Sequence, residues 1–369
     1  MAELTCPYCW KGTREKQLLQ FCPEQCGRGD TRTFFPSSAK ACPHGRQPSK
    51  TRFCPSCQKM LEHDYITTKS HIIAMIGSRQ SGKSTYVGVL VNELRNRIGP
   101  MFNNMCAELV GDRSRIRYRD VFAGPMYGKG ETLQATSPVR TQYQLDPLLL
   151  MLKFPRRRML REQLTAAMMI FYDTSGEDVL KADNLENLVD YLDAAAGIVL
   201  MIDPLQISSV ARSVADSVPK PSSSHDQVEI VQRLAELLRT RRGMAADKKI
   251  STPLAVAIGK TDALGSALPA NSVVRRPGAH DGAYDDADGW FVHDELRATL
   301  SGWADGEALL NTVDANFSKN RFFGVSALGV TPPEQGRISA SGIHPLRVED
   351  PLLWLLGRFR LIPVRKAKR

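Results

Sequence analysis

The sequence predicts a three-layer α/β fold built on a mainly parallel sheet and preceded by a small cysteine-rich module. After residue 65, short apolar runs alternate with amphipathic stretches, which is typical of a sheet covered by helices on both faces. The first apolar run ends in a glycine-rich turn at 77–84, and seven of the eight cysteines lie within the first 57 residues. We therefore expect a module over 1–64 and an α/β domain over 65–369.

The composition of the 369-residue chain, with 42% apolar residues, is ordinary for a soluble globular protein. Its longest apolar run, 194–202, is too short to cross a bilayer, and the N-terminus has no basic and apolar leader, so we expect a cytoplasmic protein. The net charge of +10 leaves nucleic acid, anionic lipid or an acidic protein open as partners. Basic clusters occur at 156–158, 239–242 and 365–369, although charge runs more often simply face water.

The cysteine-rich module has the spacing of a zinc-binding segment. Cytosolic cysteines seldom form disulfides, whereas cysteines two or three residues apart in tight turns supply thiolates to tetrahedral zinc. A segment this short could scarcely fold without the metal. We expect two zinc sites, with Cys6, Cys9, Cys22 and Cys26 in the first and Cys42, His44, Cys54 and Cys57 in the second.

The pairing of these ligands into sites stays open, because an interleaved arrangement is equally compatible with the spacing. His44 is the weakest ligand, since Gly45 stands where a second cysteine of the turn would be; a surface histidine, or a three-cysteine site completed by water, is the alternative. The segment resembles the zinc ribbons that serve as docking modules for nucleic acid or protein. The remaining cysteine, Cys106, is expected to be a buried, inert thiol.

Apolar runs and helix signals place the elements of the α/β domain. We expect strands at 72–76, 167–172, 197–202, 254–258 and 322–325, and a period-two edge strand at 139–145. Helices are expected at 83–97, 228–238 and 351–356. The spans 211–226 and 265–289, which contain many turn-forming residues, predict flexible insertions near the functional edge of the sheet.

The turn after the first predicted strand matches the phosphate-loop pattern of two glycines separated by four residues and followed by Lys and Ser. A strand that ends in such a turn and continues into a helix directs backbone N–H groups and the positive end of the helix dipole toward an anion. We therefore expect a nucleotide polyphosphate, with Lys83 reaching the β- and γ-phosphates and Ser84 ligating Mg²⁺. The motif comprises Gly77, Ser78, Arg79, Gln80, Ser81, Gly82, Lys83 and Ser84, followed by Thr85.

The second predicted strand runs into Asp173 and, three residues later, Gly176. An acidic residue at this strand end can hold Mg²⁺ through water, and a glycine lets its N–H approach the γ-phosphate. This Asp-x-x-Gly segment resembles the switch of translation-factor-type and Ras-like GTPases. The other switch needs a threonine on Mg²⁺. We prefer Thr136 to Thr132 or Thr141, because it lies where a loop meets the predicted edge strand.

The strand at 254–258 runs into Gly259, Lys260, Thr261 and Asp262. The segment resembles the Asn/Thr-Lys-x-Asp motif of GTPases, in which the Asp carboxylate accepts two hydrogen bonds that guanine offers and adenine does not. Asp262 is thus the expected guanine reader, and the stem of Lys260 would pack along the base. Gly259 departs from the motif and removes one side-chain contact to the phosphate loop. A last resemblance is the Ser-Ala-x loop that meets guanine O6, here Ser326, Ala327 and Leu328.

Turnover of the nucleotide is harder to predict. Glu177 stands where Ras-like enzymes carry a water-positioning Gln, and a carboxylate is repelled by the γ-phosphate, so we expect slow GTP hydrolysis. Arg79, inside the loop, either stabilises charge in cis or faces a partner. Two alternatives stay open: an adaptor that binds a nucleotide without turning it over, and an ATPase in which Asp262 plays no part.

The order of these segments, together with the ending Val-Glu-Asp-Pro-Leu-Leu-Trp at 348–354, resembles the bacterial double-GTPase family, second member. The resemblance covers most of the chain. It implies a Ras-like P-loop fold with GTP or GDP and Mg²⁺ as ligands. It also implies a companion GTPase, or another protein, as partner in a bacterial multi-protein system of stress response or defence.

Overall fold

The structure is a computed structural model of the 369-residue chain. It describes residues 3–22, 34–78, 80–133, 147–158, 161–173, 185–214, 218, 226–333 and 336–366.

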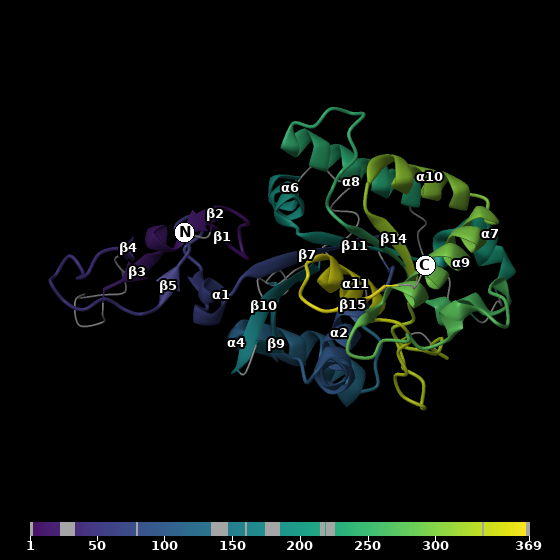
Figure 1. Ribbon diagram of the computed structural model, residues 1–369, viewed down its shortest axis with the longest axis horizontal. Helices are drawn as coiled ribbons and strands as arrows, with labels where there is room; N and C mark the ends of the chain where they lie inside the picture. The colour runs from purple at the N-terminus through teal and green to yellow at the C-terminus, as the bar shows by residue number, and fades with distance from the viewer. Residues whose placement is uncertain are drawn as a thin grey trace.

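The main body is organised around a seven-stranded sheet with the strand order β14-β12-β11-β7-β10-β9-β8 (Figure 1). Neighbours from β14 to β10 run parallel, β9 is antiparallel to β10, and β8 is antiparallel to β9. The phosphate-loop strand β7 is central. The sheet consists of β7 (Ser70–Gly77), β8 (Cys106–Leu109), β9 (Leu148–Arg158), β10 (Arg161–Asp173), β11 (Gly197–Ile202), β12 (Leu254–Ile258) and β14 (Asn320–Gly324).

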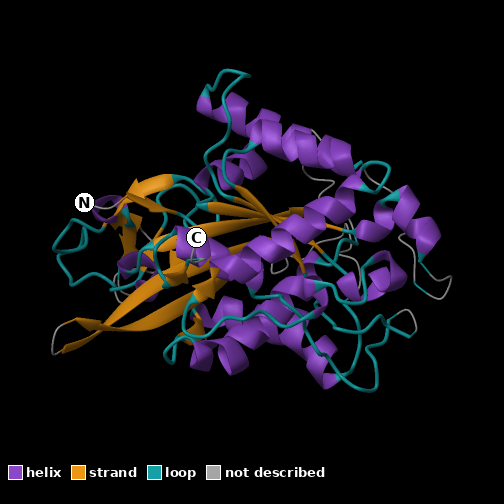
Figure 2. Cartoon of the chain, turned by 45° about the vertical axis from the view of Figure 1, so that its right-hand side comes forward, coloured by secondary structure: helices purple, strands orange, loops and turns teal. Residues whose placement is uncertain are grey.

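Helices cover both faces of the sheet, which Figure 2 shows as purple layers above and below the orange strands. Side chains of β7 alternate between the two sides: Ile72, Ala74 and Ile76 belong to one apolar cluster, and Ile73 and Met75 to the other. The first cluster packs against α6 (Leu185–Ala194), α8 (Gln227–Arg242), α9 (Asp286–Ser301) and α10 (Gly306–Asn316). The second packs against α2 (Lys83–Glu93), the π-helical segments η3 (Leu94–Ile98) and η4 (Tyr118–Gly128), and α11 (Asp350–Arg358). This arrangement confirms the predicted three-layer α/β fold.

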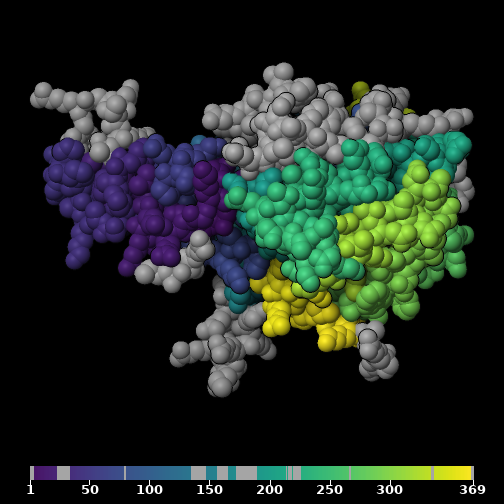
Figure 3. Space-filling view, turned by 90° about the horizontal axis from the view of Figure 1, so that it is seen from above, coloured from purple at the N-terminus to yellow at the C-terminus, as the bar shows by residue number. Residues whose placement is uncertain are grey.

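The N-terminal module lies at one end of the molecule, coloured purple and blue in Figures 1 and 3. It contains two small sheets, a hairpin of β1 and β2 and a four-stranded sheet of order β4-β3-β5-β6. Its elements are β1 (Glu3–Thr5), β2 (Gly12–Arg14), the 3₁₀ turn η1 (Glu15–Gln17), β3 (Leu19–Phe21), β4 (Phe34–Pro36), β5 (Arg52–Phe53), β6 (Met60–Leu61) and the short helix α1 (His63–Thr67).

One aromatic contact joins the module to the central strand. The rings of Trp10 and Tyr191 lie 4.7 Å apart, measured between centroids. The Tyr191 hydroxyl donates to the Ile73 carbonyl oxygen at 3.2 Å and accepts from the Met75 N–H at 3.0 Å, so it is bonded to the backbone of β7. Trp10 and Tyr191 belong to the same apolar cluster as one face of the sheet. The module therefore packs directly on the body.

The remaining elements are short and connect the layers. Among the described residues, no helix is both long and apolar enough to span a bilayer. These connecting elements are α3 (Gly99–Met101), α4 (Gly111–Arg117), η7 (Pro204–Gln206), α7 (Ser208–Ser213), η8 (Thr261–Ala267), η9 (Val273–Arg275), β13 (Tyr284–Asp285) and β15 (Val364–Arg365).

The structure corrects two expectations about local structure and adds one strand that the sequence did not predict. The span 265–289 is packed rather than loose, because Val274, His280 and Tyr284 are buried and α9 begins within it. The strand β9 was not predicted, and the expected edge strand at 139–145 lies outside the described residues. Cys106 is exposed rather than buried, because it begins the short edge strand β8. Most of the span 211–226 also lies outside the described residues.

Candidate functional site

The predicted phosphate loop connects β7 to α2 at the carboxyl end of the central strand. Two of its positions require glycine. A Cβ on Gly77 would lie 2.4 Å from the Met201 carbonyl oxygen of the neighbouring strand, so a side chain cannot fit. Gly82 has φ +87° and forms the N-cap of α2, a left-handed conformation that glycine adopts without strain. The loop thus brings its backbone close to β11 and opens toward the first turn of α2.

Lys83 lies folded against this loop. Its ammonium donates to the carbonyl oxygens of Gly77 at 2.7 Å and Ser78 at 2.9 Å, and the side chain is buried. In the described part of the chain, the buried hydroxyl of Ser78 has no hydrogen-bond partner. A phosphate would supply acceptors to both groups at the positive end of an eleven-residue helix. The residues present therefore fit a nucleotide polyphosphate.

The expected magnesium ligands are placed only in part. Asp173 is the last residue of β10 and pairs in register with Met75, two positions before Gly77, so its backbone lies beside the phosphate loop. Thr132 is described, and its N–H donates to the Gly336 carbonyl oxygen at 3.1 Å. Outside the described residues lie the expected switch and catalytic residues and one expected zinc ligand of the first site: Arg79, Thr136, Thr141, Gly176, Glu177 and Cys26.

The segment after β12 borders the phosphate loop. A Cβ added to Gly259 would lie 3.5 Å from the Ser81 carbonyl oxygen, which is ordinary contact. The Gly259 N–H donates to Ile202 at the end of β11, and the Thr261 N–H donates to Val325 beyond β14. Three strand ends and the phosphate loop therefore meet at one edge of the sheet, as expected for a ligand site in a parallel α/β fold.

Asp262 lies against the loop that follows β14. Its Oδ1 accepts a hydrogen bond from the Ser326 hydroxyl at 2.5 Å, and its Oδ2 accepts one from the Thr331 hydroxyl at 3.0 Å. The Ser326 Oγ in turn accepts from the Gly329 N–H at 2.8 Å. The structure thus brings together Asp262 and Ser326, which were predicted as parts of one base site from positions 64 residues apart.

Lys260 has a partner that the sequence reasoning missed. Its ammonium lies 2.7 Å from Oδ2 of Asp203, a carboxylate with no exposed surface. The Asp203 Oδ1 accepts from the Leu205 N–H at 3.0 Å, which caps the 3₁₀ turn η7. The sequence feature that could have pointed to Asp203 is its position directly after the buried strand β11, at the same sheet edge as Asp173.

The cysteines of the first site pair differently from the expectation. Cys6, Cys9, Cys54 and Cys57 form one group, with all sulfur atoms within 4.8 Å of one another. The Sγ atoms of Cys6 and Cys57, and those of Cys9 and Cys54, are 3.7 Å apart. Tetrahedral zinc with Zn–S bonds of about 2.3 Å would place its sulfurs about 3.8 Å apart. The expected grouping of Cys6 and Cys9 with Cys22 and Cys26 is therefore wrong, and the interleaved alternative holds for this site.

The reason is that the first and last cysteine pairs lie in matching hairpin turns. In each turn the carbonyl oxygen of the first cysteine accepts a hydrogen bond from the N–H four positions later, that of Trp10 for Cys6 and that of Gln58 for Cys54. Trp10 and Gln58 both have positive φ, 60° and 55°. The chain between the two turns is an excursion through β3 and β4. The hydrogen bond between Cys6 and Cys9 lowers the pKa of the Cys9 thiol and raises the pKa of the Cys6 thiol, so the proton of this pair stays on Cys6.

A second group consists of Cys22, Cys42 and His44, again within 4.8 Å. The Cys22 Sγ lies 3.5 Å from Nδ1 of His44. The Cys42 Sγ accepts from the Arg46 N–H at 3.4 Å, so the Cys42 turn holds a sulfur as a zinc-ribbon turn does. His44 therefore lies beside the sulfur atoms of Cys22 and Cys42 rather than at an isolated surface position.

A third cluster of metal-ligating residue types is already neutralised. His280, Asp288 and Asp350 lie within 4.8 Å of one another. The Arg347 guanidinium donates to Asp288 at 2.7 and 3.0 Å and to Asp350 at 2.8 Å, and His280 lies 2.8 Å from Asp350. The cation of this cluster is thus a buried arginine, and the cluster ties α9 to α11.

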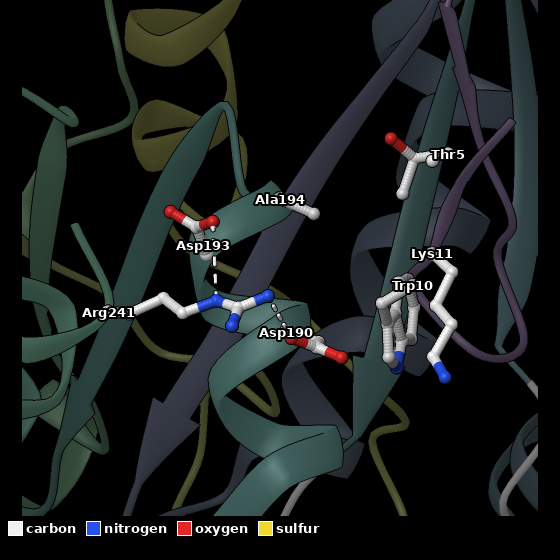
Figure 4. Close-up of a pocket in the computed structure, with 8 residues that line it drawn as sticks. Thr5, Trp10, Lys11, Asp190, Asp193, Ala194 and Arg241 are labelled. Atoms are coloured by element: carbon white, nitrogen blue, oxygen red, sulfur yellow. Dashed lines mark ion pairs between the residues drawn. The ribbon is translucent and has the colours of Figure 1, made fainter.

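Figure 4 shows a groove between the module and the body. It has a volume of about 410 Å³, with Trp10 and Lys11 on one side and α6 and α8 on the other. Arg241 projects toward Asp190 and Asp193, at 2.7 and 3.8 Å. Arg239 and Arg242 of the same basic cluster bond to Asn316 at 2.7 Å and to Asp193 at 2.8 Å. The cluster at 239–242 therefore engages neighbours within the chain.

Sequence comparison identifies a relative in Mycolicibacterium smegmatis (strain ATCC 700084 / mc(2)155), SaeC, which is named for ESX-1 scaffolding and assembly. It is 25% identical over 405 residues, and the alignment covers 97% of this chain and 99% of the relative.

Solved structures that match include the bacterial selenocysteine-specific elongation factor EF-Sec, with 12% identity and a TM-score of 0.27. That match covers 79% of this chain and 29% of the elongation factor. The GTP complex of the signal recognition particle receptor SRb with SRX from Chaetomium thermophilum matches at 12% identity and a TM-score of 0.31, over 72% of this chain and 94% of that one. A family model described as Double-GTPase 2 matches residues 71–275, which include the phosphate loop and the segment at 259–262. The chain belongs to the Double-GTPase 2 family and is a GTP-binding protein.

Proposed function

We propose that this protein is a Mg²⁺-dependent GTP switch with slow hydrolysis, whose zinc ribbon docks a protein partner. The observation that carries the proposal is the placement of Asp262. Its segment borders the phosphate loop through Gly259, and its carboxylate faces Ser326 from the loop after β14. A phosphate cradle and a doubly accepting carboxylate at one sheet edge suit a nucleotide whose base edge carries two donors, which guanine has and adenine lacks.

Within this proposal we assign a role to each predicted site residue. Lys83 and the loop backbone would bind the β- and γ-phosphates, and Lys260 would pack along the base with its ammonium held by Asp203. Ser84, Thr136 and Asp173 would hold Mg²⁺, which neutralises charge on the phosphates when bound. Gly176 would sense the γ-phosphate. Arg79 and Glu177 are the candidates for tuning turnover.

The base preference is tested by titrating the protein with GDP, ADP and XDP. We expect GDP to bind far more tightly than ADP. Asp262→Asn should weaken GDP and improve XDP, because the amide offers a donor where xanthine has a carbonyl oxygen. The control is Asp247→Asn, at a side chain that is 75% exposed. Equal affinity of the unmodified protein for GDP and ADP would refute the proposed guanine site.

Turnover separates the switch from the adaptor alternative, which Glu177 favours because it stands in place of a water-positioning Gln. Phosphate release from GTP under single-turnover conditions should be slow but measurable, and faster with a companion GTPase. No release in any condition would leave the nucleotide as a structural ligand. An ATPase would appear as tighter binding of ADP than GDP.

A protein partner is supported by the name of the SaeC relative, which refers to scaffolding and assembly. The basic cluster at 239–242 is a weaker candidate for binding nucleic acid than its sequence suggests. Its Arg239, Arg241 and Arg242 side chains bond to Asn316, Asp190 and Asp193 within the chain. We propose two zinc ions in the ribbon, one on Cys6, Cys9, Cys54 and Cys57, and one on Cys22, Cys26, Cys42 and His44. Salt-sensitive retention on DNA or RNA would contradict the choice of a protein partner.

A further inference from the structure

We infer that Thr331 is a positioning residue for Asp262 and sharpens the distinction between guanine and a purine without the 2-amino group. The inference rests on the proposed guanine site. Thr331 lies outside the four nucleotide motifs, five residues beyond Ser326.

The two oxygens of Asp262 are held by two different hydroxyls. Ser326 donates to Oδ1 at 2.5 Å, and Thr331 donates to Oδ2 at 3.0 Å. A carboxylate has about four acceptor positions, so each oxygen keeps one for a donor of the base. With both oxygens fixed, the carboxylate cannot rotate about its Cβ–Cγ bond, and the two remaining positions keep a defined direction.

Thr331 lies in the loop after β14, of which the structure describes residues 326–333 and 336–346, and we term these described residues the clamp loop. At its base Ser326 and Leu346 exchange two backbone hydrogen bonds of 3.0 and 2.8 Å, and the His344 N–H donates to Leu328 at 2.9 Å. Gly329 makes the turn with φ +80°, and an added Cβ would lie 1.7 Å from the His344 carbonyl oxygen. The base of the clamp loop is therefore a tight antiparallel pair that presents Thr331 to Asp262.

The far end of the clamp loop is anchored as well. The Ile338 N–H donates to Gly130 at 2.8 Å, and the Thr132 N–H donates to Gly336 at 3.1 Å. Glu131 and Arg337 form an antiparallel bridge between the same segments. Backbone hydrogen bonds hold the clamp loop at both ends, so the fold determines the position of the Thr331 hydroxyl.

The consequence for recognition depends on how many donors the base presents. Guanine offers N1–H and the 2-amino group, so it needs both oxygens of Asp262 in one plane with the base. Hypoxanthine, the base of IDP, offers N1–H alone, and a single hydrogen bond tolerates rotation of the carboxylate. The Thr331 hydroxyl should therefore contribute to the affinity for GDP and hardly at all to the affinity for IDP.

The experiment measures GDP and IDP affinity for the full chain and for Thr331→Val, Thr331→Ser and Thr312→Val. Thr331→Val keeps the shape and removes the hydroxyl, and should weaken GDP about tenfold, as expected for a lost hydrogen bond to a charged group. IDP affinity should change less than about twofold, and Thr331→Ser should restore the GDP affinity. Thr312→Val is the matched control, because that hydroxyl bonds to Ala308 at 2.7 Å on an exposed face of α10.

Two results would overturn the inference. Equal weakening of GDP and IDP would mean that the hydroxyl only supports the clamp loop. Tighter GDP binding would mean that Thr331 competes with the base for the carboxylate. Failure of the guanine site itself would look different, because the unmodified protein would then show no preference for GDP over ADP.

Discussion

The Lys260 ammonium lies 2.7 Å from the buried Asp203 carboxylate, so the lysine of the base motif is anchored to the end of β11. We predict that Asp203→Asn lowers GDP affinity about tenfold, because the side chain that should pack along the base loses its fixed end. The amide keeps the acceptor for the Leu205 N–H that caps η7. Isothermal titration with GDP measures the effect.

Asp226→Asn is the control for Asp203→Asn. Asp226 also caps a helix, by accepting from the Val228 N–H at 2.8 Å, but it is exposed and lies outside the sheet edge of the site. It should leave GDP affinity unchanged. An equal loss in both variants would show that the effect comes from helix capping and not from Lys260.

Zinc content gives a second prediction. Cys54→Ser removes a sulfur from the group with Cys6, Cys9 and Cys57, so the protein should lose about one zinc ion per chain, and the module should become sensitive to protease. Cys106→Ser should retain the full metal content, because Cys106 belongs to neither group in the described structure. Metal analysis of the two purified variants decides the matter. Equal zinc in both would contradict a zinc site that contains Cys54.

Arg347 should be among the most sensitive positions for stability. Its side chain is 1% exposed and bonds Asp288 and Asp350, so Arg347→Met leaves Asp288 without its cation and Asp350 with His280 as its remaining partner in this cluster. Breaking such a buried pair costs about 3–5 kcal/mol. Arg115→Met removes a pair with Asp112 in which both side chains are exposed, and should cost less than about 1 kcal/mol. Urea unfolding of both variants is the test, and similar midpoints would contradict the prediction.

We predict that the free energy of unfolding decreases as the pH is lowered, and that His293 contributes to this decrease. Burial lowers its pKa to about 4, and its Nδ1 accepts from the Phe322 N–H at 3.0 Å, so the folded chain holds the neutral ring. The unfolded chain takes up the proton below a pKa of about 6.5. From about pH 6.5 down to about 4 the unfolded state therefore binds more protons, and the free energy of unfolding decreases.

The variant His293→Asn isolates this contribution. The amide oxygen can replace Nδ1 as the acceptor and does not titrate, so the loss of stability between pH 7 and pH 4.5 should be smaller than in the unmodified protein. Part of the loss should persist, since burial also lowers the pKa of His71 to about 4. Parallel pH curves for the two proteins, from urea unfolding at each pH, would rule out His293 as a source.

The sequence predicted the central strands well because their signals are local. β11 and β12 are uninterrupted apolar runs, and their ends coincide with the predicted ones. The sequence did not predict β9, because this strand lies between two others and its residues do not alternate between apolar and polar. Periodicity therefore does not separate it from a helix. The Gly and Asp residues of the span 265–289 predict turns and a flexible insertion, whereas the burial of this span depends on distant partners such as Arg347.

The residues of the candidate site also differ in whether a local pattern predicts them. The phosphate loop, Asp262 and Ser326 belong to motifs with a fixed spacing, so the sequence could point to each of them. Asp203 contacts Lys260 from 57 positions away and Thr331 contacts Asp262 from 69 positions away, and no local pattern marks either of them. The cysteine pairing failed for the same reason: neighbours in sequence suggested one grouping, while matching hairpin turns bring the first and last pairs together.

Tyr191 has a mechanical consequence for the molecule. The Tyr191 hydroxyl bonds to the backbone of β7 on either side of Ala74, and the Tyr191 ring contacts Trp10 of the N-terminal module. That strand ends at Gly77, whose carbonyl oxygen holds the Lys83 ammonium. The N-terminal module is therefore connected to the central strand twice, by the chain that runs from α1 into β7 and by the Tyr191 side chain, so a force on the module reaches the strand that ends at Gly77.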